Sequence, residues 1–166
     1  MIVRREHPGD EASIYEVHAR AFPTTVEARL VDDLRASNEW LPRLSLVAVD
    51  GEAIVGHVVC TRAWIDPAAE PVLGLGPIGV MPGKHGRGVG RSLMVAVLAA
   101  AEALDETMVG LLGDPLFYSR FGFCLSHLFS IQPPDPAWKE HFQVRVLAAT
   151  PPAGGTFRYA EPFSRV

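Results

Sequence analysis

Apolar residues near the start of the chain recur at the spacing of two helices. They lie three or four residues apart in "PGDEASIYEVHARAF" and every four residues in "TTVEARLVDDLRAS", so helices are predicted within residues 8–22 and 24–37. Asp10 is the expected N-cap of the first helix, and Thr24 and Glu27 have the spacing of a capping box in the second. The short run "IVRR" before them predicts a strand.

Two longer β-rich segments follow. "LSLVAVDGEAIVGHVVCT" predicts a hairpin, because two runs rich in β-branched residues flank the turn signal at Asp50 and Gly51. "PVLGLGPIGV" (residues 71–80) predicts a further strand, which its glycines and Pro77 are expected to weaken and bulge.

The middle of the chain alternates between helix and strand. The segment from Gly90 to Leu104 is apolar on most of its sides, which is typical of a buried helix. "TMVGLLG" predicts a short buried strand. "DPLFYSRFG" has an Asp in the capping position, Pro at the first helical position and Gly122 as a stop, so it predicts a helix of one or two turns.

Signals are weaker in the last third of the chain. "FCLSHLFSIQ" and "FQVRVLAA" are predicted strands separated by the proline-rich "PPDPAW", and "GGTFRYAEPF" is a candidate edge segment. The resulting order is β-α-α-β-β-β-α-β-α-β-β, which indicates an α/β (α+β) fold with a mixed sheet and helices on its faces. No repeat or linker divides the chain, so residues 1–166 are expected to form a single domain.

Composition narrows the classes of function. The formal net charge is −4 and only two residues are lysine, so the clustered basic charge of a nucleic-acid-binding surface is missing. No apolar run approaches the roughly 20 residues that span a bilayer, and "MIVRREHPGDEA" turns polar too early for a targeting peptide. We therefore expect a cytoplasmic protein without a nucleic-acid or membrane partner.

The cysteines and histidines indicate no metal site. Cys60 and Cys124 lie far apart, so two buried thiols are expected rather than a disulfide. No cysteine has histidines at zinc-ligand spacing, and the histidines themselves are scattered.

The glycine-rich segment "VMPGKHGRGVGRSLM" is the clearest candidate for chemistry. It joins a predicted strand to a predicted helix, so free backbone N–H groups and the helix dipole would favour an anion there. It lacks the Gly-Lys-Ser/Thr ending of a P-loop, and its glycines have G-x-G-x-G spacing rather than G-x-G-x-x-G. A turn whose glycines serve only chain geometry is the alternative. Three basic residues would supply positive charge: Lys84, Arg87 and Arg91.

Two motifs together resemble the GNAT superfamily of N-acetyltransferases. "LGPIGVMPGKHGRGVGRSLM" resembles its central strand, Gln/Arg-x-x-Gly-x-Gly/Ala loop and helix. "LLGDPLFYSRFGF" is similar to the GDP-x-Tyr-Tyr-x-Arg-Phe-Gly-Phe segment of one subgroup of this superfamily, the predicted N-acetyltransferases of the YhbS type. "VEARLVDDLR" near the start and "GTFRYAEPF" at the end also resemble the corresponding segments of that subgroup. His85 stands where Gln or Arg is usual, and Phe117 replaces the first tyrosine of the pair.

The resemblance implies a mostly antiparallel central sheet with a splayed pair of parallel strands and helices on both faces. Acetyl-CoA, the implied co-substrate, would lie between the splayed strands, with its pantetheine arm along the strand before the loop and its pyrophosphate on the loop N–H groups. The binding residues implied in this way are Ile78, Gly79, Val80, His85, Gly86, Arg87, Gly88, Val89, Gly90 and Arg91.

Tyr118 is the candidate catalytic residue, because it occupies the position of the tyrosine that serves the CoA sulfur in many members of the family. Its alternative role is aromatic packing beside Phe117, Phe121 and Phe123. A backbone N–H near Gly79 or Val80 would polarise the carbonyl. The general base stays open, and water relay is an alternative to five side chains: Glu27, His57, Asp66, Glu70 and His127.

These residues predict an N-acetyltransferase that transfers an acetyl group from acetyl-CoA to a primary amine of a small molecule or a protein amino terminus, by direct attack in a ternary complex. A catalytically weak CoA-binding or sensing module is the alternative, and an interaction domain without CoA is a third. The acceptor, the use of a longer acyl-CoA and the oligomeric state, including a homodimer, stay open.

Overall fold

The computed structural model describes residues 1–166 and is organised around one nine-stranded sheet. Its strands follow the order β1-β2-β3-β4-β5-β8-β6, and β9 pairs with β3 and β7. Most pairs are antiparallel, whereas β4 pairs with β5, and β7 with β9, in parallel. The strands are β1 (Ile2–Arg5), β2 (Ser45–Asp50), β3 (Ala53–Asp66), β4 (Glu70–Val80), β5 (Met108–Leu112), β6 (Cys124–Leu125), β7 (Ile131–Gln132), β8 (Phe142–Val146) and β9 (Gly155–Arg158).

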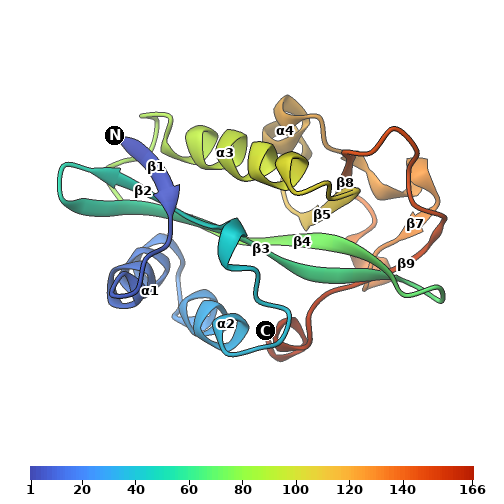
Figure 1. Ribbon diagram of the computed structural model, residues 1–166, viewed down its shortest axis with the longest axis horizontal. Coiled ribbons are helices and arrows are strands. Elements are labelled where there is room, and N and C mark those ends of the chain that lie inside the picture. The colour runs from blue at the N-terminus through green and yellow to red at the C-terminus, as the bar shows by residue number, and fades with distance from the viewer.

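Helices cover both faces of the sheet, as the sequence predicted. Figure 1 shows α3 (Val89–Ala103) and α4 (Pro115–Tyr118) above the sheet. The helices α1 (Glu11–Ala21) and α2 (Val26–Arg35) lie below it, together with the C-terminal 3₁₀ turn. The expected fold class, mixed and mostly antiparallel with a parallel pair, is therefore confirmed.

The main core lies between the sheet and α3. Leu93, Met94 and Val97 of α3 are fully buried against apolar side chains of β3 and β4, such as Val58 and Leu73. Burial on this scale is the dominant favourable term in folding. The expectation of a buried rather than surface-lying helix therefore holds for one face only, because Arg91, Val95 and Ala99 on the other face of α3 are exposed.

The parallel pair β4 and β5 opens soon after it forms. The two strands pair only at Leu73↔Val109 and Gly74↔Gly110. The register between β3 and β4 shifts just beyond this point, as the predicted bulge requires, and Pro77 has no N–H to offer a partner. Farther on, β5 continues its pairing with β8, while β4 runs on to Val80 without a neighbour on that side. The expected splayed pair is present.

Several local predictions differ from the structure. "FCLSHLFSIQ" is not one strand: the 3₁₀ turn Ser126–Phe129 separates β6 from β7, with Ser130 in the left-handed region. The C-terminal segment is not an edge, because β9 lies between β3 and β7 and is paired on both sides. Pairing to two distant strands is a long-range property that local composition does not encode.

The expected helix caps also differ. Asp10 makes no cap hydrogen bond and instead binds the guanidinium of Arg4 at 2.7 Å. Thr24 lies outside α2, whose N-cap residue is Thr25, so the capping box does not form. The β2–β3 turn falls at Gly51 and Glu52, one residue later than predicted, since Asp50 still pairs with the following strand. Cys124 is exposed rather than buried.

Candidate active site

The loop between β4 and α3 has the backbone of an anion site. Gly83, Gly86 and Gly88 have φ of +82°, +74° and +79°, values that residues with a Cβ adopt only with strain. Gly88 is the N-cap of α3, no side chain caps this end, and the first turn holds no acidic residue. The N–H groups at the start of α3 are therefore free to face an anion.

Positive side chains surround this loop. A cavity of about 400 Å³ is bounded by the loop, by Val80 and by Phe117, and Arg91 and Arg120 also line it. Neither arginine takes part in a salt bridge, whereas Lys84 is held by Asp50 at 2.9 Å. Sequence reasoning missed Arg120. The one sign of Arg120 in the sequence was its place in "YSRFGF". Its position next to Arg91 arises only from the fold.

The segment Ile78–Val80 leads into the loop along the open edge of β4. On one side these residues pair with β3, where Gly79 lies opposite His57. On the other side β4 has no strand partner beyond Gly74. The edge of β4 is therefore available to an extended ligand that pairs with it as a strand would.

Tyr118 lies at the end of α4, next to Phe117, which borders the loop cavity. Asp114 caps α4 by accepting from the Leu116 N–H, as predicted. The Tyr118 ring is half-buried and makes edge contacts with Phe117 and Phe123, at centroid distances of 4.9 and 6.0 Å. Burial raises the pKa of the Tyr118 phenol, so it stays protonated at neutral pH. The ring thus packs while its hydroxyl keeps the proton that an acid needs.

Residues 12–123 match the Acetyltransferase (GNAT) family. The chain belongs to this family. It is 33% identical over 168 residues to the uncharacterized N-acetyltransferase YhbS of Escherichia coli K12, covering 99% of both chains. It is also 36% identical over 117 residues to YjhQ of the same strain, covering 69% of this chain and 64% of that protein.

Two solved structures share the fold. The crystal structure of E. coli YhbS in complex with CoA has a TM-score of 0.91 and 32% identity, covering 99% of this chain and 92% of that chain. A GNAT family acetyltransferase from Brucella melitensis in complex with acetyl-CoA has a TM-score of 0.81 and 30% identity, covering 98% and 97%. No helix of the present GNAT protein combines the length and apolar character needed to cross a membrane.

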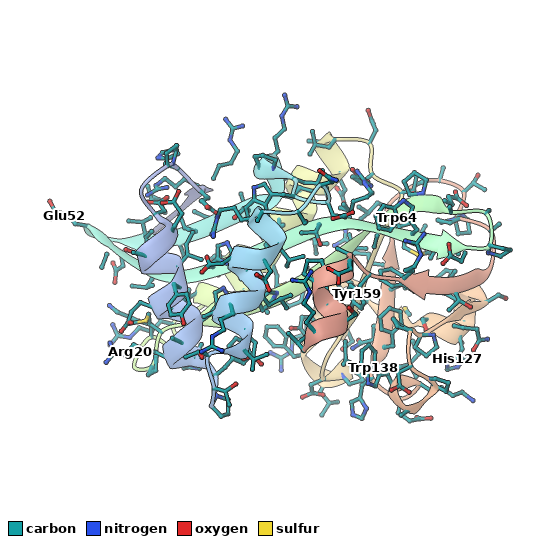
Figure 2. The ribbon with its side chains drawn as sticks, turned by 90° about the horizontal axis from the view of Figure 1, so that it is seen from below. Arg20, Glu52, Trp64, His127, Trp138 and Tyr159 are labelled. Carbon is teal, nitrogen blue, oxygen red and sulfur yellow. The ribbon has the colours of Figure 1, made fainter.

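The five candidate bases lie in different parts of this GNAT fold. Asp66 and Glu70 flank the β3–β4 turn, at the far end of β4 from Val80, and Arg158 holds Asp66 at 2.7 Å. His127 is exposed and lies far to the right in Figure 2, away from α1 and α2. Only Glu27 and His57 lie on the face that α1 and α2 cover, and Oε2 of Glu27 is buried without a hydrogen-bond partner.

His57 belongs to a buried chain of hydrogen bonds that sequence reasoning did not find. Its Nδ1 lies 2.8 Å from Nε2 of His18, and its Nε2 lies 2.9 Å from Oγ of Ser45. The Ser45 hydroxyl donates to Glu6, and Nε of Arg35 donates to the other Glu6 oxygen at 2.7 Å. No spacing along the chain signals this set, because its members come from separate elements.

A wide groove opens on the same face, beside β9. It has a volume of about 760 Å³, and its aromatic lining includes Trp64, Trp138 and Tyr159 (Figure 2). Its inner end reaches the opening between β4 and β5, because the Tyr159 ring covers Gly74 and Phe163 lies over Gly76. Four acidic side chains line it against one arginine, Arg158: Glu39, Asp66, Asp135 and Glu161.

Proposed function

We propose that this GNAT protein transfers the acetyl group of acetyl-CoA to a primary amine, either of a small molecule or of a protein amino terminus. The amine attacks the thioester directly while both substrates are bound. One observation carries the proposal: the open edge of β4 runs straight into the uncapped N-terminus of α3. An extended arm that ends in a diphosphate fits here, because the arm can pair with the edge of β4 and the diphosphate can bind at the N-terminus of α3.

The donor is held mainly by backbone groups. The pantetheine arm pairs with Ile78, Gly79 and Val80, and the pyrophosphate accepts from N–H groups between Gly86 and Arg91. Arg91 and Arg120 have no carboxylate partner, so their charge is available to phosphate. His85 lines the same cavity but is not the main anchor, because the backbone N–H donors of the loop do not depend on its side chain.

The transfer step needs two further groups. A backbone N–H near Gly79 or Val80 polarises the carbonyl and stabilises the oxyanion as it forms. Tyr118 gives its proton to the departing CoA thiolate, and burial, which raises the pKa of its phenol, keeps that proton in place at neutral pH. Burial raises the pKa of the Tyr159 phenol, and Tyr118 raises it further.

The acceptor enters through the aromatic groove. A primary amine is cationic in water, and the groove attracts such a ligand through half-buried indole rings and through Glu39 and Asp135, which have no arginine partner, unlike Asp66 and Glu161. Arg158 lies over the Trp64 ring, 4.5 Å from its centroid, and is held there by Asp66, so the groove already accommodates one cation on an aromatic face.

The test is release of CoA thiol with a panel of primary amines: a diamine, an arylalkylamine and a peptide with a free amino terminus. Steady-state patterns of a ternary complex, in which both substrates must be bound before product leaves, would support the proposal. Trp138→Ala is expected to raise KM for the amine about tenfold with little change in KM for acetyl-CoA. Tight acetyl-CoA binding without turnover would instead support a CoA-binding or sensing module.

A further inference from the structure

The carboxylate at one end of the buried chain decides the direction of every hydrogen bond in it. Glu6 pairs with Arg35 and can only accept, so the Ser45 hydroxyl donates to Glu6. Ser45 Oγ then accepts from Nε2–H of His57, which leaves Nδ1 of a neutral His57 bare. That nitrogen accepts from Nε2–H of His18. The last atom of the chain, Nδ1 of His18, therefore carries a lone pair and no proton.

Both imidazoles are neutral near pH 7. Burial lowers the pKa of His18 to about 4, with a further contribution from the positive charge of Arg35. Burial, His18 and Arg35 together hold the pKa of His57 well below its ordinary value. A second proton on either ring is unfavourable at neutral pH, so the lone pair on His18 persists.

The lone pair of His18 lies against the donor strand. Nδ1 is buried and has no hydrogen-bond partner. It faces β4 at Gly79, since a Cβ built on that residue would lie only 2.9 Å from this nitrogen. A buried acceptor without a donor is unfavourable, because it has lost its hydrogen bonds to water and gained none in the protein. An incoming donor would relieve this, and Gly79 belongs to the segment assigned above to acetyl-CoA.

We propose that His18 is the base that takes the proton of the attacking amine through Nδ1, and that Glu6, Ser45 and His57 are positioning residues that hold it in this tautomer. The proposal rests on the proposed function. An imidazole oriented by a buried carboxylate is an established arrangement for a base. Here a hydroxyl and a second imidazole stand between the carboxylate and the base.

Each bond and proton has a place in this step. The bound ammonium first loses one proton to water. The neutral amine then attacks the thioester carbon, the C–N bond forms, and a carbonyl electron pair moves to oxygen. The positively charged nitrogen of this adduct gives its proton to Nδ1 of His18. The C–S bond then breaks, its electron pair stays on sulfur, and Tyr118 protonates the thiolate. His18 releases its proton to water and Tyr118 regains one, which leaves the acetylated amine and the CoA thiol.

Glu27 is the competing base. Its Oε2 is also buried without a partner, in the first turn of α2. No hydrogen bond orients this carboxylate, whereas a directed chain holds the lone pair of His18 against β4. Orientation of this kind favours His18, because a base acts efficiently only when it is held in the right geometry.

Kinetics of matched variants test the role of His18. His18→Gln keeps an N–H donor for His57, but its amide has no basic nitrogen in place of Nδ1, so kcat should fall about 10²-fold with acetyl-CoA affinity unchanged. Thr61→Val is the control. Thr61 is fully buried on β3 but does not belong to the chain of hydrogen bonds, so kcat should stay unchanged. The proposal would be overturned if the kcat of His18→Gln stayed within twofold of the wild-type value. It would also be overturned if Glu27→Gln, and not His18→Gln, caused the large loss of kcat.

Nitrogen-15 NMR of the free protein tests the tautomer without any turnover. A bare Nδ1 on His18 in the wild type supports the proposal, and a protonated Nδ1 overturns it. Ser45→Ala should cause His18 to populate both tautomers and lower kcat about tenfold at unchanged acetyl-CoA affinity. Absence of turnover with every amine of the panel would overturn the proposed function and the role of His18 in it, while the tautomer result would still stand.

Discussion

Two polar regions meet at β4, and they are built in opposite ways. The loop from Gly83 to Arg91 is a run of neighbouring residues whose anion-binding groups belong to the backbone and face solvent. The buried chain of hydrogen bonds joins residues from separate elements, among them His18 on α1, Ser45 on β2 and His57 on β3. The loop is formed by residues that are neighbours in the sequence, whereas the chain of hydrogen bonds forms only when folding brings distant residues together.

The difference predicts where each region is sensitive. The loop should tolerate most changes of side chain and respond sharply to changes in the backbone. The buried chain should respond to the loss of any single polar atom and to protonation, because an unpaired polar group or charge in the interior is expensive. The predictions below test this contrast.

Acid should weaken the buried chain and leave the loop intact. The folded pKa of His18, about 4, lies below its unfolded value, so this contribution to stability is complete above about pH 6.5 and is lost as pH falls toward 4. Its size is roughly 3 kcal/mol over that interval. Chemical denaturation at a series of pH values measures it.

His18→Gln should flatten that slope, because it removes one titrating group. His127→Gln is the control, since His127 is exposed and the slope should stay as in the wild type. Equal slopes in His18→Gln and the wild type would show that His18 does not control acid stability.

Tyr118→Phe tests the candidate acid at the end of α4. If the hydroxyl serves the thiolate, kcat should fall about 10²-fold while acetyl-CoA affinity barely changes, because the hydroxyl matters most once charge develops on sulfur. Stability should change little, since the ring still packs against Phe117 and Phe123. Full turnover in the Phe variant, with damage only in Tyr118→Ala, would assign the residue to packing alone.

Gly88→Val tests the backbone of the loop. The φ of +79° at the N-cap disfavours a β-branched residue, so CoA binding should weaken at least about tenfold by calorimetry. Gly90→Ala is the matched control, because a Cβ there would meet Val80 and Phe117 at ordinary contact distances of 3.8 and 3.9 Å. Equal affinity in the wild type and a folded Gly88→Val variant would contradict backbone recognition of the diphosphate.

His85→Ala should have the smallest effect. The backbone donors do not depend on this side chain, so CoA affinity should fall less than it does in Gly88→Val, by about threefold or less. Arg120→Ala, which removes a full charge from the same cavity, should fall between the two. A larger loss for His85→Ala than for Gly88→Val would reverse the assignment of contacts.

Much of the architecture follows from the sequence alone. Repeating apolar positions identified α1, α2 and α3, and the alternation of glycine with basic residues identified the loop before α3. Asp114 and Pro115 marked the start of α4. These features depend on interactions within a few residues, so a local pattern is enough to reveal them. The same patterns supported the resemblance to the GNAT family.

Only the tertiary structure decided the rest. His18 looked like one residue of an amphipathic helix, Ser45 like the start of a strand, and Arg120 like part of a short turn. Packing α1 against β3 turned the first two into parts of one hydrogen-bond chain, and packing α4 beside α3 placed Arg120 next to Arg91. Contacts between distant segments depend on how whole elements pack, and no spacing along one sequence records that.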